Sequence, residues 1–146
     1  MKISAGVLLA SAYLLAGPAI GHDDHVAIFK NVSGSVTVVR LDADLKAVSG
    51  MELLKSDKVV SGAGASSGIV FKDGTLLTIG SSSEVVIRDY AFEPKESKYA
   101  FSVYLAKGKA IYSSGKIGKL SPDSVSVETP KATIGVRGTR FIVEAE

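Results

Sequence analysis

The 146-residue chain contains no cysteine and no tryptophan. Without cysteine it has no disulfide bond, thiolate zinc site, iron–sulfur cluster, cysteine nucleophile or lipid-modified cysteine. No excess of one charge is present either, since 17 basic and 15 acidic residues leave a formal net charge of +2. A nucleic-acid-binding protein needs a concentrated basic face, so this balance argues against that class. The length suits a single domain with its own core.

Charges are also scarce at the N-terminus, where Lys2 is the only charged residue before Asp23. Residues 3–16 are uncharged and mostly apolar, and small residues follow them. A basic start, an apolar run of about 7–15 residues and a small-residue exit are typical of a secretory signal peptide. We therefore interpret residues 1–21 as a signal peptide, cleaved after Gly21 or, as second choice, after Ala19.

Cleavage would place the mature protein in the periplasm or outside the cell. The alternative is an uncleaved anchor in the inner membrane, with the rest of the chain facing the periplasm. A membrane span needs about 20 apolar residues. The run reaches that length only when Gly17, Pro18 and Gly21 are counted, so the sequence favours cleavage.

The remaining chain repeatedly shows the two-residue alternation of β-strands, interrupted by glycine, serine and aspartate. Asp73-Gly74 predicts a hairpin turn, and a second turn is predicted at 107–109. Helical turns are conceivable only around 44–46 and 49–54. The predicted strands cover residues 34–40, 68–71, 75–79, 84–90, 99–105, 110–112, 124–128, 132–136 and 139–143. We predict an all-β single domain of short antiparallel strands, a β-sandwich or roll, with a short β-solenoid as the alternative.

Two sequence segments are the most distinctive of the chain. One is FKDGTLLTIGSSS at residues 71–83, and the other is TPKATIGVRGTRF at residues 129–141. With 32–38 and 50–62 they make the chain resemble the FecR domain, named for a bacterial regulator of iron-dicitrate uptake. The resemblance runs over residues 32–143. We therefore divide the chain into the signal peptide (1–21), an N-terminal segment (22–31) and a FecR-like β domain (32–146).

The resemblance carries functional expectations. In members with the full architecture, a cytoplasmic region acts on a sigma factor, a membrane span follows, and a periplasmic FecR domain leads to a portion that meets a TonB-dependent receptor. Only Met1 and Lys2 precede the apolar run here, so we expect no anti-sigma region. The resemblance then implies an exported, non-enzymatic binding module without a cofactor, which contacts an envelope protein in signalling or protein assembly. A carbohydrate-binding or surface-structural β protein is the alternative.

Five residues of the two distinctive segments are candidates for a structural motif or a partner contact: Arg137, Gly138, Thr139, Asp73 and Gly74. Arginine offers five donors in a fixed fork. Arg137 could therefore tie loop carbonyls, or a carboxylate such as Asp73 or Glu128, within the domain, or it could anchor a partner. Gly138 and Gly135 are three residues apart, which suggests a bulge or a close backbone contact.

Histidine is rare, and both copies, His22 and His25, lie next to the predicted cleavage site with Asp23 and Asp24 between them. Imidazole and carboxylate donors suit copper, nickel or zinc, so these histidines form a candidate metal site. The alternative interpretation is a polar, flexible N-terminal segment that binds no metal. A Ser-His-Asp catalytic triad would require one of these two histidines to reach a serine of the β domain. We predict that the protein is not an enzyme.

Lysines and aromatic residues are interleaved between positions 90 and 119. Strand alternation assigns most of the aromatic side chains to packing, and lysines protect exposed sheet edges from aggregation. The alternative is a surface for acidic glycans.

Overall fold

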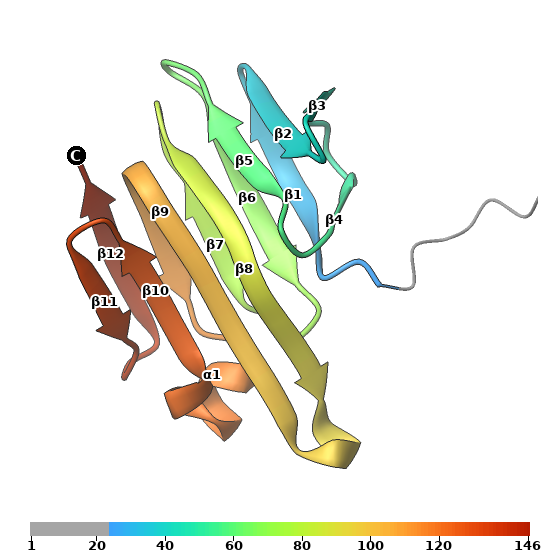
Figure 1. Cartoon of the computed structure of the whole chain (residues 1–146), viewed down its shortest axis with the longest axis vertical. Coiled ribbons are helices and arrows are strands. Elements are labelled where there is room, and N and C mark those ends of the chain that lie inside the picture. The colour runs from blue at the N-terminus through green and yellow to red at the C-terminus, as the bar shows by residue number, and fades with distance from the viewer. Residues whose placement is uncertain (1–23) are drawn as a thin grey trace, which may run out of the picture.

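The computed structural model describes residues 24–146, so the predicted signal peptide lies outside the described residues. Within that range the chain forms one twelve-stranded sheet that is bent into two layers (Figure 1). Among the strand pairs of the described residues, β9 with β10 is parallel and the others are antiparallel. This confirms the predicted all-β single domain of sandwich or roll type.

Each layer collects strands from both ends of the chain. The first layer contains β1 (Ala27–Ser33), β4 (Glu52–Leu53), β6 (Ser66–Phe71), β7 (Leu76–Ile79), β12 (Arg140–Ala145) and the second half of β9 (Lys98–Ser113). The second layer contains β2 (Val36–Arg40), β3 (Ala43–Lys46), β5 (Lys58–Ser61), β8 (Glu84–Glu93), β10 (Val125–Thr129), β11 (Ala132–Gly135) and the first half of β9.

Strand β9 joins the two layers. Its first half pairs with β8 and β10, and from Gly108 onward it pairs with β12 and β7. The predicted turn at 107–109 is therefore wrong as a break between strands, because the chain bends there without leaving the strand (Figure 1). Gly108 has φ +95°, a value that glycine adopts readily and other residues rarely do. The glycine thus provides a corner within one strand.

A second irregularity lies in β8. The alternation over 84–90 predicts that Asp89 shares the face of Val85 and Ile87, but Asp89 is exposed and Tyr90 is buried. The pairing with β9 shifts between Ile87 and Asp89. A β-bulge inserts one residue and reverses the alternation beyond it, so the prediction for Asp89 was wrong for a local geometric reason.

The short helices also differ from the sequence prediction. Residues 44–46 belong to β3, and 49–54 contain a turn and β4, so the two candidate helical turns were wrong. The described residues instead contain η1 (Pro94–Glu96), α1 (Lys116–Leu120) and η2 (Pro122–Ser124). Within residues 24–146, no helix has the length and apolar character needed to cross a membrane.

The core fills the space between the layers. An aromatic cluster lies within it: the rings of Phe71 and Phe101 are 4.9 Å apart, Phe101 and Tyr112 are 5.5 Å apart, and Phe71 and Tyr90 are 5.2 Å apart. Edge-to-face and tilted aromatic pairs of this kind add stability beyond the area they bury. The lysines between 95 and 119 are exposed. Most aromatic side chains of this stretch pack inward as alternation predicts, since Tyr90, Phe101 and Tyr112 are buried and Phe92 and Tyr99 pack partly buried against the core.

Candidate functional site

The first distinctive segment forms a buried polar centre at Asp73, which is 2% exposed. Its Oδ1 accepts a hydrogen bond from the Tyr90 hydroxyl at 2.8 Å, and its Oδ2 accepts one from the Thr75 hydroxyl at 2.7 Å. The Tyr90 oxygen accepts in turn from the backbone N–H of Asp73 at 2.9 Å. The β6–β7 hairpin turn is thereby fixed to β8 of the other layer.

Asp73 also holds the start of α1. The carboxylate Oδ2 accepts from the backbone N–H of Ile117 at 3.0 Å, and the Asp73 carbonyl accepts from that of Lys116 at 2.9 Å. Helix N-termini leave N–H groups without intrahelical partners, and the residue preceding α1, Gly115, has no side chain to cap them. Asp73 therefore caps a helix that follows it by more than forty residues in the sequence.

Glycines permit this close arrangement. Gly74 adopts φ +88° in the turn, as the Asp-Gly pair predicts. A Cβ on Gly115 would lie 2.7 Å from the Asp73 carbonyl oxygen, which is too close for any side chain. The Asp73 turn is thus explained by folding, because both carboxylate oxygens of Asp73 and the hydroxyl of Thr75 form hydrogen bonds inside the domain.

Burial and the hydrogen bond to Asp73 raise the pKa of Tyr90 well above its usual value, with burial as the larger cause. Burial likewise raises the pKa of Tyr112. The unfolded chain loses its tyrosine protons near pH 10, whereas the folded state retains them. These side chains therefore stabilise the fold fully below about pH 10, and this stabilisation is lost as the pH rises further.

We expect the free energy of unfolding to fall steeply above about pH 10 in the native protein and less steeply in Tyr90→Phe, because that variant lacks one retained proton. Part of the pH dependence of the free energy of unfolding remains in this variant, because Tyr112 also retains its proton in the folded state. The measurement is urea denaturation at several pH values between 8 and 11.5, roughly spanning the tyrosine titration. Tyr104→Phe keeps its ring and is the control, and an identical slope in Tyr90→Phe and the native protein would contradict the assignment.

The second distinctive segment lies at the surface. It spans the end of β10, the turn Pro130–Lys131, β11, the loop 136–139 and the start of β12. Arg137, Gly138 and Thr139 are exposed, whereas Val136 is buried. A Cβ on Gly135 or Gly138 would meet no atom within 4 Å. The close backbone contact predicted from the two glycines is therefore absent from this part of the structure.

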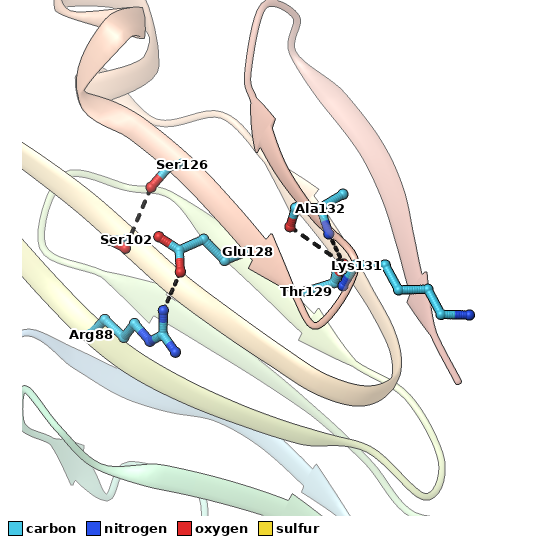
Figure 2. Close-up of polar contacts among 7 residues, drawn as sticks. All are labelled: Arg88, Ser102, Ser126, Glu128, Thr129, Lys131 and Ala132. Atoms are coloured by element: carbon cyan, nitrogen blue, oxygen red, sulfur yellow. Dashed lines mark hydrogen bonds and ion pairs between the residues drawn. The ribbon is translucent and has the colours of Figure 1, made fainter.

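The suggestion that Arg137 binds Asp73 or Glu128 is wrong, because both carboxylates bind other residues. Asp73 has the partners described above, and Glu128 forms an ion pair with Arg88 (Figure 2). Among the described residues, no hydrogen bond or ion pair involves the Arg137 side chain. It lines a shallow hollow of about 430 Å³ together with Asp123 and the backbone around Gly135.

The outer face of the second layer carries a polar row next to this segment (Figure 2). Ser126 of β10 donates to Ser102 of β9 at 3.4 Å, close to the Arg88–Glu128 pair. The Arg88 guanidinium also lies 4.1 Å from the ring centre of Tyr104. These contacts hold β10 against β9 and β8, so the polar side chains of this row have a structural role in strand pairing.

The β10–β11 turn is closed by Thr129, whose hydroxyl accepts from the backbone N–H of Ala132 at 3.1 Å. The side chain of Lys131 extends from the turn to the side opposite the Arg88–Glu128 pair (Figure 2). Between this turn and the end of β12 lies a groove of about 690 Å³, and Ile134 and Val143 are among its apolar lining residues. The second distinctive segment thus borders both the hollow at Arg137 and this groove.

The candidate metal site is only partly described. His22 and Asp23 lie outside the described residues. His25 Nδ1 lies 3.8 Å from a carboxylate oxygen of Glu52. Within residues 24–146, no three histidine or acidic side chains gather in a way that could hold a metal ion. Metal binding by His22 and His25 stays a prediction for the N-terminal segment.

Comparison with known protein families gives a match over residues 57–146 to the family described as FecR protein. The match begins at Asp57, whose buried carboxylate binds Arg40 at 2.7 Å, and it includes both distinctive segments. Strands β1 to β4 precede it in the sequence but belong to the same sheet. No curated protein and no solved structure gave a match. Because the family match covers more than half of the chain, this protein belongs to the FecR family.

Proposed function

We propose that this protein is an exported, non-enzymatic binding module of cell-envelope signalling, and that it contacts an envelope protein through the loop 136–139. The family association with envelope signalling supports the process. The apolar run behind Lys2 supports export. The surface is proposed from the position of Arg137.

One observation carries the choice of surface: the two distinctive segments are used in opposite ways. The carboxylate of Asp73 and the hydroxyl of Thr75 are buried and bonded within the domain. The loop around Arg137 exposes its side chains, and among the described residues the arginine has no bonded partner. Internal contacts explain Asp73 in the first segment and leave the side chain of Arg137 in the second without an internal partner among the described residues.

The chemistry of the loop suits a protein contact. An exposed guanidinium offers several donors in one plane, which match a carboxylate or a pair of backbone carbonyls. Arginine is also enriched among the residues that dominate binding at protein interfaces. The hollow beside Arg137 contains apolar atoms of Val125 and Val136, so a partner side chain can be buried next to the ionic contact.

The test places a photo-crosslinking amino acid at position 137 and, as a control, at Lys46, which is exposed on the edge strand β3. Both proteins are expressed in the native host and crosslinked in intact cells. We expect one discrete envelope-protein adduct from position 137 and none from position 46. Arg137→Ala should weaken binding to the identified protein at least tenfold, which corresponds to about 1.4 kcal/mol, while its stability changes by less than about 0.5 kcal/mol, as for an exposed side chain.

Two results would contradict the proposal. One is a large loss of stability in Arg137→Ala, which would give the arginine a structural role. The other is binding to a glycan array with no protein adduct at position 137, which would favour the carbohydrate-binding alternative. Mass spectrometry of the same preparation should find a mature chain that begins at His22, and an intact N-terminus inside the cytosol would contradict export.

A further inference from the structure

Strand β12 ends the first layer with an unpaired edge. Among the described strands it pairs with β9 alone. Unpaired edges expose backbone N–H and C=O groups that readily bind another strand, and proteins usually protect them. The exposed side chains of β12 are Arg140, Ile142 and Glu144. Ile142 at the middle of the strand is 57% exposed, and a carboxylate oxygen of Glu144 lies 3.4 Å from Nζ of Lys109 of β9.

The hydrogen-bond pattern shows which backbone groups face the free edge. The N–H of Ser114 donates to the Thr139 carbonyl at 2.7 Å, so the alternation of an antiparallel ladder directs Phe141 and Val143 toward β9. On the other side of β9, the Gly80 N–H donates to the Lys109 carbonyl at 2.9 Å, which fits the same alternation. The backbone groups of the alternate residues therefore point outward, and these residues are Arg140, Ile142 and Glu144.

The same three residues make the edge complementary to itself. If two β12 strands lie antiparallel with Ile142 opposite Ile142, then Arg140 of each strand lies opposite Glu144 of the other. Opposite charges and apolar side chains directly across a strand pair are stabilising, and like charges are destabilising. The three aligned residues are also the ones whose N–H and C=O groups face outward, so this register forms hydrogen bonds at each of these positions.

The surroundings favour the same arrangement. Ile142 pairs with Ile111 of β9, so a second Ile142 would extend an existing apolar contact. The second layer ends on the same side at β11 (Figure 1). Three of its four residues are small or short, Ala132, Thr133 and Gly135. Two-fold related copies of β11 can therefore approach each other next to the paired β12 strands.

We propose that two copies of this chain associate through antiparallel pairing of their β12 strands, centred on Ile142. The contact is isologous, as two-fold symmetry requires. It uses a different surface from the loop at Arg137 and goes beyond the proposed function.

The experiment measures the mass of the purified mature chain by light scattering and sedimentation over a range of concentrations. We expect a dimer that dissociates on dilution. Arg140→Glu and Glu144→Arg each place like charges opposite one another twice, because of the symmetry, and each should weaken the dimer about tenfold or more. The double variant, Arg140→Glu with Glu144→Arg, restores both opposite pairs across the contact and should recover most of the affinity that each single variant loses, although the arginine introduced at position 144 then lies beside Lys109.

Ile142→Pro tests the pairing at the edge of β12 without removing a hydrogen bond of the fold. The N–H of Ile142 faces outward, and proline is tolerated at such edge positions because no ladder hydrogen bond is lost. We expect this variant to be monomeric with an unchanged circular dichroism spectrum. Val143→Pro removes an N–H directed at β9 and is expected to disturb folding instead.

Three results would overturn the proposal: a monomeric native chain at all concentrations, a dimer that survives Ile142→Pro, or a double charge variant that stays as weak as the single ones. Failure here leaves the crosslinking proposal at Arg137 standing, because that proposal expects an adduct with a different protein, which its mass distinguishes from an adduct with a second copy of this chain.

Discussion

Alanine in place of Asp73 is expected to lower the free energy of unfolding by roughly 3–5 kcal/mol. The buried carboxylate accepts hydrogen bonds from the hydroxyls of Thr75 and Tyr90 and from the backbone N–H of Ile117. Removing it leaves these donors buried without an acceptor, and each such group costs about 1–3 kcal/mol. Urea denaturation followed by circular dichroism measures the loss.

Three variants make this result specific. Asp73→Asn keeps the size of the side chain but turns an NH₂ group toward donors, so we expect a loss of about 2 kcal/mol or more. Tyr90→Phe removes a single hydroxyl and should cost less than Asp73→Ala. Asp44→Ala, at an exposed position of β3, should stay within about 0.5 kcal/mol of the native protein. A loss below about 1 kcal/mol in Asp73→Ala would contradict the central role of its carboxylate.

The turn at Asp73 could be predicted from the sequence, but its partners could not. An Asp-Gly pair between two alternating segments is a local signal, and Gly74 has the positive φ that this signal implies. The bond to Tyr90 depends on the β-bulge before Asp89, which shifts the pairing with β9. A bulge changes which face a residue occupies without changing the residue types around it, so alternation alone placed Asp89 on the face of Val85 and Ile87.

Helix α1 was missed for a related reason. It has five residues and no capping side chain of its own, and its N-terminal donors are satisfied by Asp73 instead. Sequence rules for helix starts look for a cap next to the helix. The cap here comes from a hairpin in another part of the chain, and only the folded arrangement brings the two together.

The exposed segment around Arg137 shows a different limit of prediction from sequence. The sequence singled out Arg137, Gly138 and Thr139, but an arginine between glycines is compatible with an internal ion pair and with a partner contact. The structure argues only against the internal ion pair, because Glu128 is held by Arg88 and Asp73 by Tyr90 and Thr75. Long-range pairing of charges is set by the topology of the sheet rather than by local sequence.

Gly108→Ala is expected to be the other severely destabilising change, with a loss of roughly 3–4 kcal/mol. Two costs combine at this corner of β9. The residue has φ +95°, which costs an L-residue about 1–2 kcal/mol. A Cβ would also lie 2.5 Å from the Cα of Ser83, and Ser83 is fully buried with its hydroxyl accepting from the Lys109 N–H at 2.9 Å.

Gly50→Ala separates these two costs. Gly50 has a similar φ of +87°, and a Cβ there would meet no atom within 4 Å. We therefore expect Gly50→Ala to lose only the conformational part, about 1 kcal/mol. The difference between the two variants in urea denaturation measures the contact between Gly108 and Ser83. Equal losses would show that backbone strain alone accounts for Gly108, and that the bend of β9 between the layers tolerates a side chain at its corner.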